Sequence, residues 1–348
     1  MNDEIKYISR CLQLAQLAGG HVSPNPMVGA VLVCDNTVIG EGFHQHFGED
    51  HAEPNAINSV KDPELLKRAT LYVSLEPCSY YGKTPPCADL IVSKKIPRVV
   101  IGTLDPNPKV AGKGVEILRR AGVEVIVGVL EDECRELNKR FFIFQEQKRP
   151  YVLIKWAQTQ DGFIDRIRTD ASEPPLLISN NITKLLTHKM RSENQAILVG
   201  ANTVLLDNPS LTVRNWSGKS PVRIAIDRQG RIPATFNLLD GSIPTIVFTE
   251  KEQVNRHRVE FVKINFDADC LKTILHEIFL RNIHSVLIEG GASILNSFIE
   301  AGLWDEANIE VSPQQISVGV KAPVLLLQPV SHTIFEGHDW LYFKNKTE

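Results

Sequence analysis

The sequence predicts an α/β protein of two domains, and three observations support this. The chain has 348 residues, which at roughly 150 residues per domain corresponds to about two domains. Short apolar segments alternate with segments of helical periodicity, a pattern typical of sheets that have a parallel portion and helices on both faces. A charged helical segment at 133–150 ends at Pro150. We therefore expect one domain at 1–148 and a second at 149–348.

The first domain is expected to begin with a helix, because Ile5, Ile8, Leu12 and Ala15 recur at helical spacing. A turn at Asp35 then separates two apolar segments and predicts a β-hairpin. The expected order from this hairpin onward is strands at 27–34 and 37–44, a helix at 51–60, a strand at 69–78, a helix at 88–96, a strand at 98–106, a helix at 113–121, a strand at 123–130 and the closing helix at 133–150.

The second domain continues the alternation of strands and helices. Two loop-sized stretches rich in proline and glycine, 205–221 and 228–244, are expected above its sheet, where ligand contacts are common. The expected elements are a strand at 151–157, a helix at 180–192, strands at 196–201, 222–227 and 245–249, a helix at 268–281, a strand at 285–291, a helix at 292–303 and strands at 307–311 and 340–344.

Composition excludes several classes of protein. The chain is 43% hydrophobic, and it has no apolar run near the ~20 residues that cross a bilayer, so we expect no membrane association. The net charge of -3 provides no basic field for nucleic acid. The N-terminus lacks the basic start and continuous apolar stretch of a secretory signal, and we expect a cytoplasmic protein. Six cysteines are too few for a disulfide scaffold, so those that matter are expected to be ligands or nucleophiles.

A zinc site is predicted in the first domain. His51 and Glu53 open a helix, and Cys78 and Cys87 follow later, each directly after a proline. Either pattern alone is weak, but in this order they match the zinc-deaminase signature, with a longer loop between the cysteines. Three protein ligands leave the fourth position of zinc to a water molecule, and the nearby glutamate would move the proton of that water. The other cysteines are expected to be small core residues: Cys11, Cys34, Cys134 and Cys270.

Four segments of the first domain, 25–31, 51–57, 74–87 and 105–114, closely resemble the bifunctional riboflavin-biosynthesis deaminase/reductase family. The resemblance covers nearly the whole chain. It implies a cytidine-deaminase-like domain that releases ammonia from 2,5-diamino-6-(5-phosphoribosylamino)pyrimidin-4(3H)-one, a small phosphorylated pyrimidine. By position, it implies zinc ligands at His51, Cys78 and Cys87, a proton donor at Glu53, and substrate contacts at Asn25, His44, Lys83 and Asn107. Tyr80 stands where the family usually has histidine.

The second domain has no Rossmann dinucleotide fingerprint, but Gly290 and Gly291 join a strand to a helix, and such a junction can hold an anion. A glycine pair is also the ordinary way to turn sharply between these elements. Segments 196–214 and 286–306 resemble the reductase domain of the same family. That resemblance implies a dihydrofolate-reductase-like fold that uses NADPH to deliver a hydride to C1' of the ribosylamino group.

Several residues of the second domain acquire roles from this resemblance. Lys155 and Asp161 fit the first strand and the loop after it. The implied cofactor contacts are Ala157, Thr203, Asp207, Gly291, Ala292, Ser293, Ile294, Leu295, Asn296 and Ser297. The implied substrate contacts are Arg191, Leu211, Arg214 and Glu289, where the arginines suit a phosphate.

The second domain also departs from the family pattern. The chain reads Pro-Leu-Leu-Ile-Ser at 175–179 instead of S-x-W-I-T, so that Leu177 replaces an aromatic residue, and the loop from Asp161 is longer than usual. Segment 312–323 lacks the usual P-K-L-x-G. Arg228 replaces a serine or threonine, and as a hypothesis it pairs with the 2'-phosphate of NADPH.

Alternative interpretations stay open at this point. One is a deaminase whose reductase domain is degenerate. Another is a nucleic-acid base deaminase with an appended domain, which needs the basic channel and stacking aromatic residues that this composition disfavours. A third is a structural zinc module, which usually has four protein ligands. We also expect a homo-oligomer.

Overall fold

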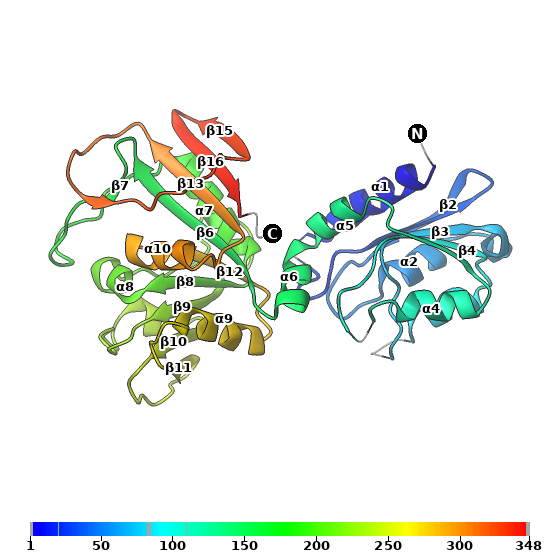
Figure 1. The fold of residues 1–348 in the computed structure, drawn as a ribbon, viewed down its shortest axis with the longest axis horizontal. Helices are drawn as coiled ribbons and strands as arrows, with labels where there is room; N and C mark the ends of the chain where they lie inside the picture. Colours follow the sequence, from blue (N-terminus) through cyan, green and yellow to red (C-terminus); the bar gives the residue numbers. More distant parts are fainter. Residues whose placement is uncertain (1–2, 20, 82–84, 109, 346–348) are drawn as a thin grey trace. The chain divides into compact units, whose positions relative to one another are not determined.

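The computed structural model describes residues 3–19, 21–81, 85–108 and 110–345. It divides into two compact units, 1–148 and 149–348, each with its own sheet and core (Figure 1). Among the described residues, no helix has the length and apolar character needed to cross a membrane.

The first unit is built on a five-stranded sheet in the order β2-β1-β3-β4-β5. The predicted hairpin is present as β1 (Gly29–Cys34) and β2 (Thr37–Phe43), with both turn residues, 35 and 36, at positive φ. β1 also pairs antiparallel with β3, while β3, β4 and β5 run parallel. The remaining strands are β3 (Thr70–Leu75), β4 (Arg98–Thr103) and β5 (Glu124–Val127).

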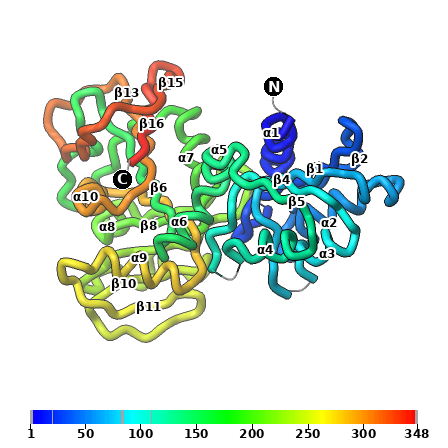
Figure 2. The backbone as a smooth tube through the Cα atoms, turned by 45° about the vertical axis from the view of Figure 1, so that its right-hand side comes forward, coloured from blue at the N-terminus to red at the C-terminus, as the bar shows by residue number. Residues whose placement is uncertain are grey.

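Helices cover both faces of this sheet, as expected, because side chains alternate along its strands (Figures 1 and 2). On β1, Val31 and Val33 join the apolar cluster that contains α1. Leu32 points the other way, into the cluster that contains α2 and α3. The helices are α1 (Asp3–Gln16), α2 (Ala52–Asn58), η1 (Pro63–Arg68), α3 (Cys87–Ser93) and α4 (Lys113–Arg120).

The closing segment, 133–150, was expected as one helix, and this prediction was wrong. The structure has two helices, α5 (Glu131–Leu137) and α6 (Lys139–Gln147), separated at Asn138. The buried Asn138 side chain accepts a hydrogen bond from the Met27 N–H at 2.8 Å and donates one to the Met27 carbonyl at 2.9 Å. This side chain therefore satisfies both backbone groups of a distant residue, and the chain changes direction there.

The second unit has a nine-stranded sheet in the order β11-β10-β9-β8-β12-β6-β13-β16-β15. Its strands are parallel from β11 to β13, and β16 and β15 are added antiparallel at one edge. The strands are β6 (Tyr151–Thr159), β8 (Ala196–Gly200), β9 (Val222–Ile226), β10 (Thr245–Thr249), β11 (Val259–Lys263), β12 (Ser285–Glu289), β13 (Glu306–Ser312), β15 (Ser331–Phe335) and β16 (His338–Lys344). β7 (Phe163–Asp165) and β14 (Val320–Lys321) form a separate pair.

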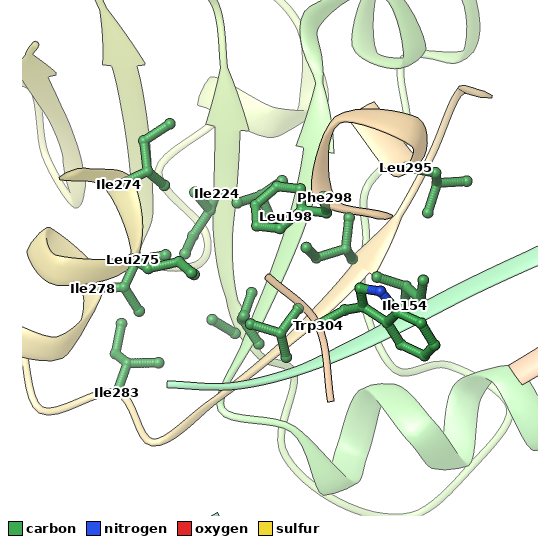
Figure 3. Packing of buried hydrophobic residues seen from close by; sticks show 14 of the residues in the cluster. Ile154, Leu198, Ile224, Ile274, Leu275, Ile278, Ile283, Leu295, Phe298 and Trp304 are labelled. Atoms are coloured by element: carbon green, nitrogen blue, oxygen red, sulfur yellow. The ribbon is translucent and has the colours of Figure 1, made fainter. Parts of the chain in front are cut away.

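Two apolar clusters cover the opposite faces of this sheet. Ile154 and Leu198 pack with α9 (Cys270–Leu280) and α10 (Ala292–Glu300), as Figure 3 shows. Leu153 points to the other cluster, which includes residues of α8 and α7. These last helices are α7 (Asn181–Glu193) and α8 (Ala201–Asp207), and a short turn of helix is η2 (Asn237–Leu239).

Sequence patterns missed β11, α8 and the edge strand β15. α8 has only seven residues, too few for periodicity to distinguish it from a loop. The residues of β15 are almost all exposed, so they lack the apolar alternation of a half-buried strand. Of the cysteines expected in the core, Cys11, Cys34 and Cys134 are buried, whereas Cys270 is only partly buried.

Candidate active sites

Three residues from different elements of the first unit place metal-ligand atoms together. His51 precedes α2, Cys78 follows β3, and Cys87 is the first residue of α3. His51 Nδ1 lies 3.6 Å from Cys78 Sγ and 3.4 Å from Cys87 Sγ. All the ligand atoms lie within 4.8 Å of one another.

These atoms fit the coordination shell of zinc. In a tetrahedral site, a sulfur at about 2.3 Å and a nitrogen at about 2.0–2.1 Å from the metal lie about 3.5 Å apart. The two observed nitrogen–sulfur distances lie on either side of that value. The Cys87 N–H donates to Cys78 Sγ at 3.3 Å, a hydrogen bond that stabilises a thiolate. The donor set therefore matches a zinc site with one position left for water.

Glu53 lies in the first turn of α2, two residues after the histidine ligand, and is 3% exposed. Burial raises the pKa of its carboxyl to about 7, while the neighbouring His51 opposes that rise. The packing of α2 on the hairpin fixes this placement, because a Cβ at Gly42 would lie 2.3 Å from the Ala56 nitrogen. The helix therefore approaches the sheet closely and carries both His51 and Glu53 to one edge.

Asn25 and His44 lie beside the metal ligands. His44 is 2% exposed, and its ring lies at an edge-to-face angle to His51, 5.4 Å between centroids. Its Nδ1 faces the Asp50 carbonyl at 2.9 Å, and its Nε2 lies 3.1 Å from Asn25 Nδ2. The carbonyl can only accept a hydrogen bond, so Nδ1 carries the hydrogen and Nε2 accepts a hydrogen bond from the Asn25 amide. Burial lowers the pKa of His44, which favours this neutral form.

Glu76, two residues before Cys78, organises the loop that carries Asn107. Its buried carboxylate accepts hydrogen bonds from the backbone N–H groups of Asp105 at 3.2 Å, Gly112 at 2.9 Å and Val115 at 3.2 Å. Sequence reasoning did not single out this glutamate, because its partners lie far along the chain.

Two other expectations for this site have different outcomes. Lys83, expected near the substrate, lies outside the described residues. Tyr80, which replaces the histidine of the family pattern, is 45% exposed.

The second unit contains a cavity of about 1060 Å³ at the carboxyl ends of its parallel strands. The last residues of β8, β9 and β12 line it, together with residues 155–157 of β6 and the first turns of α8 and α10. This edge is where ligands bind in open α/β sheets. The Thr203 hydroxyl accepts a hydrogen bond from the Gly291 N–H at 3.1 Å, and Gly290 has φ 147, which favours glycine.

Ion pairs organise the charged walls of this cavity. Arg191 binds Glu289 through both ends of its guanidinium, at 2.9 and 2.6 Å, and also donates to the Thr212 carbonyl. Lys155 is buried, with its Nζ 3.9 Å from the Glu310 carboxylate. Desolvation lowers the pKa of Lys155, and the nearby carboxylates of Glu289 and Glu310 oppose this shift.

Other cavity residues are held by pairs at the surface. Arg228 is more than half exposed and lies 3.0 Å from Glu250. Arg231, three residues later, donates to Asn202 at 2.9 Å. Arg214 donates from its backbone to the ring of His188 at 3.1 Å, and its guanidinium is exposed.

The chain's relatives identify this architecture. Residues 1–103 match the cytidine and deoxycytidylate deaminase zinc-binding region, and residues 150–329 match the RibD C-terminal domain. The riboflavin biosynthesis protein RibD of Aquifex aeolicus is 40% identical over 333 residues, covering 94% of this chain and 92% of that protein. RibD of Bacillus amyloliquefaciens is 41% identical over 329 residues, covering 92% and 87%. The chain belongs to the RibD family.

Solved structures of RibD proteins agree with this assignment. A diaminohydroxyphosphoribosylaminopyrimidine deaminase/5-amino-6-(5-phosphoribosylamino)uracil reductase from Thermotoga maritima superposes with a TM-score of 0.85 at 37% identity, covering 98% of both chains. RibD of Acinetobacter baumannii also superposes with a TM-score of 0.85, at 31% identity, covering 98% of both chains. The protein is therefore a bifunctional deaminase and reductase of riboflavin biosynthesis.

Membership of the RibD family settles two of the alternatives. The appended domain of the nucleic-acid base deaminase alternative is instead a RibD C-terminal domain, which fills most of the second unit. The match to the RibD C-terminal domain also excludes a structural zinc module with a non-enzymatic partner domain.

The structure places most of the expected reductase residues on the cavity wall. Those that line it are Lys155, Ala157, Arg191, Thr203, Asp207, Arg214, Arg228, Glu289, Gly291, Ala292, Ser293, Ile294 and Ser297. Leu295 and Leu211 are buried in the apolar clusters, and Leu211 has φ 53. Asp161 accepts hydrogen bonds from the N–H groups of Ile316 and Ser317 and so anchors the segment 312–323. Asn296 is partly buried on α10.

The cavity also contains residues that sequence reasoning missed. Arg168 and Arg231 line it, and so does Cys270 at the start of α9. The sequence offered one indication for Arg231, because it lies close to Arg228 in the Pro/Gly-rich stretch 228–244, which was expected above the sheet. The sequence offered no such indication for Arg168, since a charged residue in a long loop is usually exposed to solvent.

Proposed function

We propose that the first unit, 1–148, deaminates 2,5-diamino-6-(5-phosphoribosylamino)pyrimidin-4(3H)-one with the help of zinc. The second unit, 149–348, then uses NADPH to reduce the ribosyl group to ribityl. The observation that supports the deaminase most directly is the set of three ligand atoms beside the buried Glu53. The reactions named for the Thermotoga maritima relative support both substrates.

In the deaminase, His51, Cys78 and Cys87 would hold the zinc ion. When bound, zinc lowers the pKa of a water molecule in its open position. The role proposed for Glu53 is to take up one proton from the attacking water and give it to the amino group, so that the water oxygen would bond to the ring carbon and ammonia would leave. A carboxyl pKa near 7 suits both halves of this transfer.

Substrate recognition is assigned to the residues around the zinc ligands. Asn25 and neutral His44 form a hydrogen-bonded pair at this edge, and the pair fixes the orientation of the Asn25 amide that is proposed to contact the pyrimidine. Asn107 lies on the loop that Glu76 holds, and Lys83 completes the set.

In the reductase, NADPH would supply the hydride. Residues 291–297 at the start of α10 are proposed to hold the cofactor, together with Thr203 and Asp207 of α8 and Ala157 on β6. Gly291 leaves backbone N–H groups accessible at a helix start, where an anion is favoured.

A second group of residues in the second unit is proposed to bind the substrate of the reductase. Arg214 has an exposed guanidinium that is proposed to bind the 5'-phosphate of the substrate. Arg191 and Glu289 form an ion pair on the cavity wall and are proposed to orient the substrate. Leu211 supports this wall from the core.

Glu53→Gln tests the deaminase. The variant keeps the metal ligands but has no carboxylate to carry the proton, so we expect zinc content to be retained and ammonia release to fall by about 10²–10⁴-fold. NADPH oxidation with deaminated substrate serves as the internal control. The exposed Glu64→Gln is the matched control. Ammonia release at the original rate in Glu53→Gln would remove the proposed role.

Arg228 is proposed to select NADPH over NADH by pairing with the 2'-phosphate. It lines the cavity and has a side chain that is more than half exposed. Arg228→Ala should raise KM for NADPH and leave KM for NADH unchanged, whereas Arg256→Ala should change neither. An unchanged NADPH/NADH preference contradicts the pairing. Ammonia release by the wild type without any NADPH oxidation would instead indicate a degenerate reductase.

A further inference from the structure

Arg168 occupies an unusual position for an arginine in a loop. It lies between β7 and α7 in the segment 166–179, which we call the strap. Its side chain is 3% exposed although the two residues before it are exposed, and it lines the reductase cavity. Nothing in the roles assigned above uses this guanidinium.

The guanidinium of Arg168 joins two parts of the cavity wall. Its Nε donates to Asp165 at 2.7 Å, and its Nη2 donates to Asp207 at 2.5 Å. Nη1 lies 3.4 Å from the Leu206 carbonyl at the end of α8 and 3.3 Å from the Glu173 carbonyl within the strap. One side chain therefore connects the strap, β7 and the last turn of α8.

These contacts also balance charge at a helix end. Asp207 is the last residue of α8, where the aligned carbonyl groups already give partial negative charge. A carboxylate is unfavourable there unless a cation lies beside it, and Arg168 supplies that cation. The planar guanidinium can contact both carboxylates and the carbonyl groups at once.

Other anchors hold the last part of the strap, and Arg168 holds its first part. Asp165 accepts from the Leu176 N–H at 2.8 Å, and Gln314 donates to the Leu177 carbonyl at 2.9 Å. Residues 175–179 of the strap line the cavity. Release of Arg168 would therefore free the first part of the strap from α8.

We propose that Arg168 is a positioning residue of the reductase. It fastens the strap to α8 and holds the Asp207 carboxylate, and in this way it sets the affinity of the cavity for the nicotinamide cofactor. Part of this effect is electrostatic, since without Arg168 two uncompensated carboxylates would face a polyanionic cofactor. The inference rests on the proposed binding of NADPH in this cavity.

The test compares Arg168→Ala and Arg168→Lys with the wild type. NADPH binding is measured by the quenching of tryptophan fluorescence, because Trp156 lines the cavity. We expect Arg168→Ala to raise Kd and KM for NADPH by roughly ten- to a hundredfold, since misplaced walls cost affinity, with a much smaller change in kcat at saturating cofactor. Arg168→Lys should give intermediate values of Kd and KM, because lysine keeps the positive charge but lacks the planar guanidinium that contacts several acceptors at once.

Arg281→Ala is the matched control. Arg281 also binds two carboxylates, those of Glu260 and Glu277, at the end of α9. It should leave NADPH affinity unchanged, and ammonia release should be unchanged in all variants. Wild-type Kd and KM in Arg168→Ala, a fall in kcat alone, or an equal loss in Arg281→Ala would overturn the inference.

Failure of the cofactor proposal has a different signature. The wild type is titrated first with NADPH and NADH. Binding of NADH alone overturns the choice of NADPH, and the arginine variants are then compared with NADH. If the wild type binds neither NADPH nor NADH, the cavity is not the cofactor site, and the inference about Arg168 is then also wrong.

Discussion

The buried Glu310 of the second unit lies in a network of polar side chains. Glu310 is fully buried on β13 and accepts hydrogen bonds from Ser179 at 2.6 Å and Thr183 at 2.7 Å. His338 lies 2.9 Å from it, and Lys155 lies 3.9 Å away. A carboxylate in this position would be costly without such contacts, so the network determines how the first strand of the unit meets the cavity.

His284 gives a pH-dependent prediction for stability. Burial lowers its pKa from 6.5 to about 4, so the unfolded chain binds a proton more readily than the folded one. The neutral histidine therefore contributes fully above pH 6.5, and this contribution is lost as the pH falls toward 4, up to roughly 3 kcal/mol. Urea unfolding at several pH values should show a steeper loss for the wild type than for His284→Gln.

The control for His284 is His332→Gln, which changes an exposed histidine of the same unit. Parallel stability curves for the wild type and His284→Gln would contradict the prediction.

Single residues differ in how well the sequence predicts them. His51, Glu53, Cys78 and Cys87 are recognisable because zinc chemistry demands particular residue types in order. The contacts of Arg168 depend on where the loop folds back, and no spacing rule encodes them.

At the scale of elements, α4 begins at the expected residue but without a side-chain cap of its own, since Gly112 precedes it. The Glu76 carboxylate serves instead, accepting from the Gly112 and Val115 N–H groups. A distant residue therefore satisfies the start of this helix and joins it to the loop that leads to Cys78.

Glu76→Gln should destabilise the first unit by about 1–3 kcal/mol, because an amide cannot replace a carboxylate that accepts from three backbone groups. Denaturant unfolding followed by circular dichroism measures this. Glu116→Gln removes an exposed carboxylate from the same helix and should have little effect. Equal stability of the two variants would show that the carboxylate does not cap the helix.

Elements with strong periodicity were predicted well, and those without it were missed. The hairpin and the parallel strands of both units have continuous apolar segments, so their positions follow from the sequence. β11 and β15 are defined by pairing with a neighbouring strand, and local sequence does not contain that information.

At the scale of the whole molecule, the two activities depend on separate chemistry. The His and Cys ligand group lies entirely in the first unit, and the large cavity lies in the second. A zinc chelator should therefore abolish ammonia release while NADPH oxidation with deaminated substrate continues. Added zinc should restore ammonia release. Loss of both activities on chelation would contradict this independence.

The hydrogen bonds between Asn138 and Met27 also matter while the chain is being made. The two residues are 111 positions apart, and each backbone group of Met27 has its partner on the asparagine side chain. Until residue 138 has left the ribosome, the segment that carries Asn25 toward the zinc ligands lacks these partners. A growing chain can therefore make the residues of its hairpin early, but Met27 gains its hydrogen-bond partners only when nearly the whole first unit has been synthesised.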